Sequence, residues 1–240
     1  MNILIPMAGA GSRFEKAGYK DPKPLIKIFD KPMIEWVINN IKNDDAHYIF
    51  IAQKDHCKKY NFENTIKNIC KKYSIIEIEG ITEGAACTTL LAKHFIDNEE
   101  KLIIANSDQY VEWSNEDFKS FYSNENLDGN ILIFNSNHPK WSYVKVDENN
   151  YVKSVAEKIV ISNMATVGIY YWKNGSDYVK YAEKMIANND RFNNEFYVCP
   201  VFNYSIKDDK KIGIYHIKNM WGLGTPEDLN IFLERYKNEN

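Results

Sequence analysis

The chain has 240 residues, and its 33 acidic and 30 basic side chains leave a formal net charge of only −3. This near balance gives no sign of the strongly basic face that nucleic acids and anionic membranes select, so we expect neither as a partner. With 44% hydrophobic and 14% aromatic residues, the composition is that of a folded globular protein. We expect one domain over residues 1–240, with halves at 1–128 and 129–240.

Hydropathy and cysteine usage limit the class of protein further. No apolar run approaches the roughly 20 residues that cross a bilayer, and the first apolar run is too short for a signal peptide. We therefore expect a cytoplasmic protein. The four cysteines form no Cys-x-x-Cys pair, which favours free thiols over a zinc site or a disulfide framework. The oligomeric state stays open, a homo-oligomer included.

Apolar runs alternate with amphipathic segments in the first half. We expect buried strands at 2–7, 48–52, 75–78 and 102–105, with helices at about 34–42, 62–73 and 84–96 between them. This alternation predicts an α/β fold with a mainly parallel sheet and helices on both faces. In such a sheet, ligands bind at the carboxyl ends of the strands.

The second half has more strands and fewer helices. We expect strands at 130–134, 143–146, 151–155, 167–172 and 212–217, and helices at 176–187 and 196–204. These strands predict a mixed extension of the sheet. The last helix is marked by Thr225 as N-cap, Pro226 at the first helical position and Asp228 in the place of the usual capping-box glutamate.

A glycine-rich loop, Gly9-Ala10-Gly11-Ser12-Arg13, follows directly on the first predicted strand. Glycines let the backbone N–H groups approach an anion, and Arg13 and Lys23 supply positive charge. The spacing is not that of a P-loop, and Phe14 stands where a dinucleotide fingerprint has its third glycine. A plain strand-to-helix turn is the alternative. The prolines on both sides of Lys23 make this alternative less favoured, because they hold the lysine in a stiff extended segment suited to a phosphate. We infer a nucleoside triphosphate site.

Asp108 follows the predicted strand at 102–105 and so lies at the same sheet edge as the glycine loop. Mg²⁺ takes one or two protein carboxylates and fills its other positions with phosphates and water. A turn or helix-cap aspartate is the alternative, but the nearby loop favours the metal. The small residues of 82–89 either admit a base or ribose or pack a helix on the sheet, and the sequence leaves both open.

Six motifs together resemble the sugar nucleotidyltransferase family, also called nucleoside diphosphate sugar pyrophosphorylases, over nearly the whole chain. They are the loop at 9–14, Pro22-Lys23-Pro24, Asn106-Ser107-Asp108, Glu157-Lys158, Val167-Gly168-Ile169-Tyr170-Tyr171 and Gly224-Thr225-Pro226-Glu227-Asp228. The resemblance implies a three-layer α/β/α, GT-A-like (Rossmann-like) nucleotidyltransferase fold. It implies two ligands in the presence of Mg²⁺: a nucleoside triphosphate in residues 1–128 and a phosphorylated small-molecule acceptor in residues 129–240.

The resemblance also implies a role for each matching residue. Arg13 holds the leaving pyrophosphate, Lys23 lies at the α-phosphate, and Asp108 binds Mg²⁺. The implied nucleotide-binding residues are Ala8, Gly9, Ala10, Gly11, Ser12, Glu83, Gly84, Ala85 and Ser107, and the implied acceptor-binding residues are Glu157, Lys158 and Gly168. A second metal-binding aspartate, frequent in the family, is replaced by Gly222, with Glu195 and Asp228 as candidate substitutes.

Within the family, the chain is most similar to a surface-polysaccharide branch that includes a cytidylyltransferase acting on phosphoglutamine. The main expectation is therefore transfer of CMP from CTP to a phosphorylated small molecule, with release of pyrophosphate, for a capsule precursor. The alternative is a sugar-1-phosphate nucleotidyltransferase that uses UTP, dTTP or GTP. Two further alternatives are a non-catalytic nucleotide-binding protein and a GT-A glycosyltransferase, whose Asp-x-Asp metal pair is missing at Asp108-Gln109-Tyr110.

Overall fold

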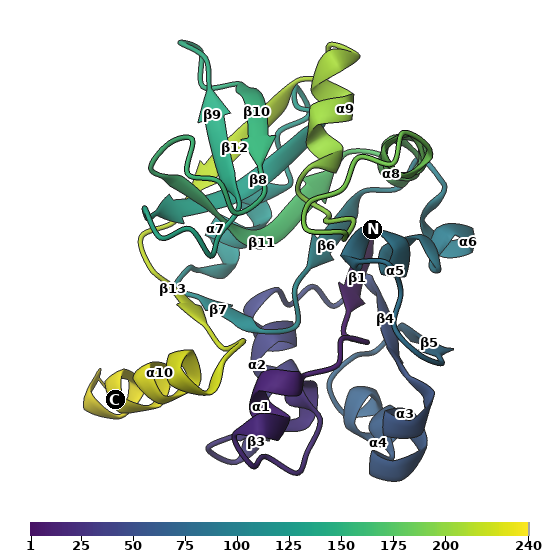
Figure 1. The fold of residues 1–240 in the computed structure, drawn as a ribbon, viewed down its shortest axis with the longest axis vertical. Coiled ribbons are helices and arrows are strands. Elements are labelled where there is room, and N and C mark those ends of the chain that lie inside the picture. The colour runs from purple at the N-terminus through teal and green to yellow at the C-terminus, as the bar shows by residue number, and fades with distance from the viewer. Residues whose placement is uncertain (240) are drawn as a thin grey trace.

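A computed structural model describes residues 1–239 and shows a nine-stranded sheet in the order β10-β9-β11-β6-β1-β4-β5, with β8 and β12 branching from β11 (Figure 1). Every strand predicted from the sequence is present, with its ends shifted by a few residues at most. The strands are β1 (Asn2–Pro6), β4 (His47–Gln53), β5 (Tyr73–Ile78), β6 (Leu102–Ala105), β8 (Gly129–Asn135), β9 (Tyr143–Val146), β10 (Val152–Ala156), β11 (Met164–Trp172) and β12 (Ile212–His216).

The pairing pattern joins the two predicted halves of the chain. β1 runs parallel to β4 and β6, and Leu4 lies opposite both Ile49 and Ile104 in the ladders. All three side chains are buried, as expected for a strand covered on both faces. β11 pairs antiparallel with β6, so residues of the first and second halves share one sheet.

Helices cover both faces of this sheet and confirm the predicted three layers. Side chains of β1 alternate between two buried clusters, with Leu4 in one and Ile3 and Ile5 in the other. The Leu4 cluster also includes residues of α5 (Ala85–Leu90), α6 (Lys93–Ile96), α8 (Gly175–Ala187) and α9 (Val201–Lys207). The opposite cluster includes residues of α2 (Met33–Asn40), α3 (Lys54–Tyr60), α4 (Phe62–Lys67) and α7 (Asn115–Phe121).

A third buried cluster joins the two ends of the chain. It holds Phe14 of α1 (Ser12–Lys16), Ile28 of the small hairpin β2 (Lys27–Ile28) and β3 (Lys31–Pro32), and Leu229 and Phe232 of α10 (Pro226–Glu239). All four of these side chains are at most 1% exposed. The last helix and the short helix that follows the glycine loop thus bury side chains in the same cluster.

Three predicted helices differ from the structure. The segment 84–96 forms two helices, α5 and α6, and the segment 62–73 is helical only in α4. The prediction of a helix at 196–204 is wrong in its first part, because α9 begins at Val201, directly after Pro200. Proline is common just before or at the first helical position, since it has no N–H to donate there.

Several short elements were missed, among them α3, α7 and the two-stranded ribbon of β7 (Gln109–Val111) and β13 (Met220–Gly222). All four cysteines are free thiols, as predicted. Within residues 1–239, no helix is both long enough and apolar enough to span a membrane.

Candidate functional site

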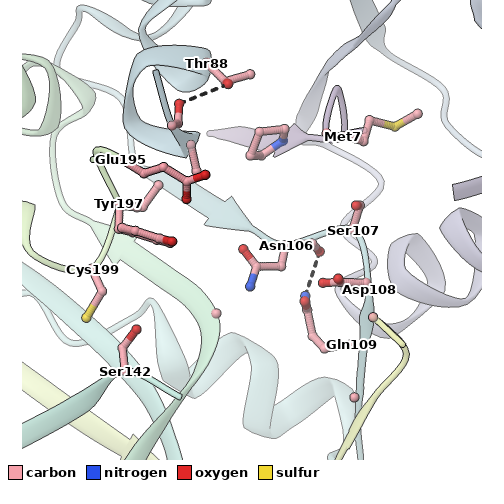
Figure 2. A pocket seen from close by; sticks show the side chains of 18 of the residues that line it. Met7, Thr88, Asn106, Ser107, Asp108, Gln109, Ser142, Glu195, Tyr197 and Cys199 are labelled. Carbon is pink, nitrogen blue, oxygen red and sulfur yellow. Dashed lines mark hydrogen bonds between the residues drawn. The ribbon is translucent and has the colours of Figure 1, made fainter. Parts of the chain in front are cut away.

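A cavity of about 810 Å³ opens beside the carboxyl ends of β1 and β6 and next to β11. Its size is typical of a small-molecule site. Figure 2 shows side chains of both halves around it, with Asn106 to Gln109 on one side and Ser142, Glu195, Tyr197 and Cys199 on the other. The predicted site residues that line it are Ala8, Gly9, Ala10, Arg13, Lys23, Gly84, Ala85, Ser107, Asp108, Glu157, Lys158 and Gly168.

Three predicted nucleotide-binding residues lie behind or outside this lining. Gly11 precedes α1 with a φ of 63°, and a Cβ built there would lie 3.6 Å from the Cβ of Lys23. Ser12 is the exposed first residue of α1. Glu83 forms an ion pair with Arg191, and its side chain is 66% exposed. Direct contact of these three with a nucleotide stays a prediction.

Lys23 and Asp108 form an ion pair inside the cavity. Lys23 Nζ lies 2.7 Å from Asp108 Oδ2, and the two side chains are 24% and 25% exposed. The lysine is not in an extended segment as predicted, because it begins the short 3₁₀ turn Lys23–Leu25. Pro22 still fixes the start of this turn, since its carbonyl accepts a hydrogen bond from Leu25 N–H at 2.8 Å. The ammonium is thus held at the cavity wall by a turn.

Asp108 is held by the loop that follows β13. Its carbonyl accepts a hydrogen bond from Leu223 N–H at 2.8 Å. A Cβ on Gly224 would lie only 2.6 Å from Asp108 Oδ2, so glycine is the residue that lets the loop approach this carboxylate. The residue after Asp108, Gln109, donates a hydrogen bond from Nε2 to the Asn106 carbonyl at 2.7 Å. The other side-chain atom of this amide, Oε1, is buried and has no hydrogen-bond partner within residues 1–239.

The donor set around Asp108 fits Mg²⁺ bound through one protein carboxylate. No group of three or more histidine, cysteine, aspartate or glutamate side chains that could enclose an ion occurs within the described part of the chain. The Asp108 carboxylate lines the cavity of about 810 Å³ together with Arg13 and Lys23. An ion there would complete its coordination with phosphate oxygens and water, which is the coordination that Mg²⁺ prefers.

Both candidate substitutes for the missing second aspartate, Glu195 and Asp228, line the cavity. Asp228 Oδ2 lies 3.5 Å from the position of a Cβ on Gly222, and its carboxylate is paired with Lys140 Nζ at 2.9 Å. Asp228 N–H donates to Thr225 Oγ1, so the predicted N-cap is confirmed. The Asp228 carboxylate accepts hydrogen bonds from Lys140 Nζ, and both residues line the cavity. The side chain of Asp228 is therefore directed to the cavity and not to the N-terminus of α10.

The second half provides a buried polar floor. Glu157 follows β10, is 8% exposed and accepts a hydrogen bond from the Ser142 hydroxyl. Burial raises the pKa of this carboxyl, and the Ser142 bond and the charge of Lys158 offset part of that effect. Cys199 is buried in the same region, and burial raises the pKa of its thiol. A ligand with hydroxyl groups finds both donors and acceptors on this floor.

Lys158 occupies a backbone conformation that side-chain-bearing residues adopt rarely, with a φ of 53°. Its N–H donates to the Trp141 carbonyl at 3.1 Å, and its Nζ donates to the Tyr197 hydroxyl at 2.7 Å. Tyr197 was missed in the sequence because it fell in the wrongly predicted helix. Pro200 was the available signal, since a helix that starts after it leaves residues 196–199 free to line a site.

Gly168 lies at an irregular point of β11, where the register with β8 shifts, and has a φ of 91°. A Cβ at this position would lie 2.0 Å from Asn106 Nδ2. The Gly168 carbonyl accepts a hydrogen bond from Asn106 N–H at 2.9 Å. Glycine here lets β11 pass directly beside the segment that carries Asp108.

The small residues before and in α5 have two separate uses. Gly84 and Ala85 line the cavity, whereas Ala86 is fully buried in the core. The hydroxyls of Thr82 and Thr88 are hydrogen-bonded to each other at 2.6 Å. Gly84 thus lines the cavity and Ala86 packs in the core, while Ala85 does both, because it also packs against the Leu4 cluster.

Comparisons with known proteins agree on one family. The family described as Nucleotidyl transferase matches residues 3–235. A bifunctional sugar-1-phosphate nucleotidylyltransferase/acetyltransferase of Sulfurisphaera tokodaii is 28% identical over 238 residues, which are 94% of this chain and 53% of the relative. The catalytic subunit beta of mannose-1-phosphate guanylyltransferase of Drosophila melanogaster is 26% identical over 70% of this chain and 47% of its own length. The chain thus spans about half the length of these curated relatives.

Solved structures show the same fold. A nucleoside-diphosphate-sugar pyrophosphorylase of Vibrio cholerae superposes with a TM-score of 0.83 at 24% identity, covering 97% of this chain and 99% of that one. With the family match over nearly its full length and a cavity that gathers the glycine loop, Lys23 and Asp108, the chain belongs to the nucleotidyl transferase family.

Proposed function

We propose that this protein transfers a nucleoside monophosphate from a nucleoside triphosphate to the phosphate of a sugar 1-phosphate and releases pyrophosphate. The observation that supports this most strongly is the composition of the cavity. Arg13 and Lys23 line it from the first half of the chain, and Glu157 and Lys158 line it from the second. A cavity with cations at two places, contributed by two parts of the sheet, suits two phosphorylated ligands that must meet.

In the proposed reaction, an oxygen of the acceptor phosphate attacks the α-phosphorus in line with the departing pyrophosphate. A new P–O bond forms, the bond to the β-phosphate oxygen breaks, and that oxygen leaves with the electron pair. A phosphate is already ionised at neutral pH, so no general base is required. Catalysis then consists of alignment and of charge stabilisation by Lys23 at the α-phosphate and Arg13 at the pyrophosphate.

The ion pair of Lys23 with Asp108 gives both groups a defined position before substrate binds. An incoming triphosphate offers Lys23 a more strongly charged partner and leaves Asp108 available as a cation ligand. Asp108 would hold Mg²⁺ there, and the ion would supply Lewis-acid charge for the transfer. Lys158 and Glu157 orient the acceptor, the lysine at its phosphate and the carboxyl at its hydroxyl groups.

The names of the relatives support the sugar-1-phosphate alternative rather than the cytidylyl transfer that was the main expectation. The archaeal relative is named for sugar 1-phosphates and the insect relative for mannose 1-phosphate and guanylyl transfer. We therefore propose a sugar 1-phosphate as acceptor and leave the base to experiment.

A pyrophosphate-release screen tests this proposal. UTP, dTTP, GTP and CTP are each mixed with Mg²⁺ and with glucose 1-phosphate, mannose 1-phosphate, glucosamine 1-phosphate, inositol 1-phosphate or a phosphorylated amide. We expect release with at least one sugar 1-phosphate, and loss of release in Lys23→Ala. Lys54→Ala, which removes a lysine paired with Glu79 outside the cavity, is the matched control. Triphosphate binding without release under every acceptor overturns the proposal, and release with CTP and a non-sugar acceptor alone restores the cytidylyl interpretation.

A further inference from the structure

A short segment between α8 and α9, residues 190–200, which we call the crossing segment, connects the two sides of the cavity. Phe196 N–H donates to the Glu83 carbonyl and its own carbonyl accepts from Ala86 N–H, both at 2.9 Å. A Cβ on Gly84 would lie 2.4 Å from the Phe196 carbonyl oxygen, so the contact is close because of a glycine. The backbone of the crossing segment is thereby fixed to the start of α5.

The next residue of the crossing segment, Tyr197, lines the cavity beside Glu195 (Figure 2). Its hydroxyl accepts a hydrogen bond from Lys158 Nζ at 2.7 Å, and the same nitrogen lies 4.5 Å from the centre of the phenol ring. Lys158 takes part in none of the ion pairs within residues 1–239. Tyr197 is therefore the group that determines where this ammonium rests.

The protonation state of the Tyr197 phenol suits it to accept a hydrogen bond from Lys158. Burial raises the pKa of Tyr197 far above that of free tyrosine, and the neighbouring Glu195 carboxylate raises it further. The hydroxyl is therefore neutral at physiological pH, so that it keeps its own proton while a lone pair accepts from Lys158. Because a neutral phenol does not neutralise the ammonium, the charge of Lys158 remains available to an anion.

The backbone conformation of Lys158 is a second restraint on the position of its side chain, at the end opposite to Nζ. A φ of 53° in a residue with a side chain costs on the order of 1 kcal/mol or more and persists only where surrounding contacts impose it. The Lys158 N–H bond to the Trp141 carbonyl, at 3.1 Å, is one such contact. With the backbone held at one end and Nζ at the other, a long flexible chain loses less conformational entropy when it meets a ligand.

We propose that Tyr197 is a positioning residue that fixes the Lys158 ammonium for the anionic group of the acceptor. This inference rests on the proposed function, because it assigns the acceptor side of the cavity to Lys158. It goes further in naming a residue that touches no reacting atom, and it predicts that loss of the hydroxyl weakens acceptor binding while leaving triphosphate binding unchanged.

Tyr197→Phe is the test, since it removes the hydroxyl and keeps the ring. We expect KM for the best sugar 1-phosphate of the screen to rise about tenfold, which is the effect of about 1.4 kcal/mol. KM for the triphosphate stays unchanged and kcat falls less than threefold. Tyr181→Phe is the matched control, because Tyr181 also accepts from a lysine, Lys180 Nζ at 3.4 Å, but lies outside the cavity.

A double-mutant cycle with Lys158→Ala separates positioning from any independent role of the phenol. If Tyr197 acts through Lys158, adding Tyr197→Phe to Lys158→Ala changes KM for the acceptor by less than twofold. A tenfold rise in both backgrounds overturns the inference, as does an unchanged KM in the single variant.

A second measurement does not depend on turnover. Acylation of the neutral amine form of lysines in the ligand-free protein, with a limiting reagent and quantification by mass spectrometry, reports how accessible each amine is to the reagent. We expect Lys158 to react several times faster in Tyr197→Phe than in the native protein, with Lys180 as internal reference. Equal rates in the two proteins overturn the inference even if the screen finds a substrate. Faster labelling in the absence of any turnover refutes the proposed function and leaves the Tyr197 contact established.

Discussion

Lys23 Nζ and Asp108 Oδ2 lie 2.7 Å apart although 85 residues separate them in the sequence. Lys23 comes from the turn after the glycine loop and Asp108 from the segment between β6 and β7, and parallel pairing of β1 with β6 brings the two segments together. Each side chain is about three-quarters buried at the cavity wall. The opposite charges expected at a metal–triphosphate site are thus adjacent before any ligand binds.

Lys23→Ala removes the cation proposed for the α-phosphate. We expect kcat to fall by a factor on the order of 10² or more, because this charge is most useful when negative charge develops during transfer. The measurement is steady-state pyrophosphate release with the substrates identified in the screen. An effect below threefold would reduce Lys23 to a surface lysine.

Asp108→Asn keeps the size of the side chain and removes its charge. We expect Mn²⁺, used as a paramagnetic substitute for Mg²⁺, to lose its tight site when titrated in the presence of triphosphate and followed by electron paramagnetic resonance. The free energy of unfolding should change by about 1 kcal/mol or less, since partly exposed ion pairs contribute little. Native-like Mn²⁺ binding in this variant would exclude Asp108 as the ligand.

Glu157 makes stability depend on pH in a defined direction. Burial raises its pKa above the 4.5 of a free glutamate, so the folded protein holds this proton more tightly than the unfolded chain. The contribution of the Glu157 proton to the free energy of unfolding is fully present below pH 4.5 and is lost as the pH rises through the raised pKa. Glu157→Gln stays neutral and can still accept from Ser142.

The comparison of native protein with Glu157→Gln tests that direction. We expect the native free energy of unfolding to fall relative to the variant as the pH is raised from 4.5, measured by urea denaturation. Glu79→Gln is the control, because this carboxylate is 76% exposed and paired with a surface lysine. A difference that grows as the pH is lowered would contradict the assignment.

Gly168→Ala should destabilise the protein by about 2 kcal/mol or more. A φ of 91° is strained for alanine, and its Cβ would lie 2.0 Å from Asn106 Nδ2. Gly9→Ala is the matched control for stability, since a Cβ there meets nothing within 4 Å, and we expect a change of about 1 kcal/mol or less. Chemical denaturation measures both. Equal stabilities would mean that the β11 irregularity relaxes without cost.

The sheet was predictable because its strands carry their own signal. Continuous apolar runs such as that of β1 mark strands buried on both faces, and that pattern needs no knowledge of a partner strand. The ribbon of β7 and β13 has no such signal. It pairs Gln109 with Gly222, more than a hundred residues away, and each strand has only three residues.

The site was predictable to the same extent. Arg13, Lys23 and Asp108 were found from the chemistry of short local motifs next to strand ends, and all three line one cavity. Lys140 and Tyr197 were missed, because what makes them site residues is the fold that brings Asp228 and Lys158 to them. The Tyr197 segment was also obscured by an apolar run that imitates a helix.

The buried cluster shared by α10 and α1 means that residues of the last helix support the glycine loop. Phe14 lies one position after Arg13, and its buried ring packs in a cluster that Leu229 and Phe232 complete. If α10 detaches, Phe14 loses this cover and the arginine loses its fixed helix, while both faces of the central sheet stay closed. Activity would then be lost by local detachment of α10, at a temperature below that of global unfolding.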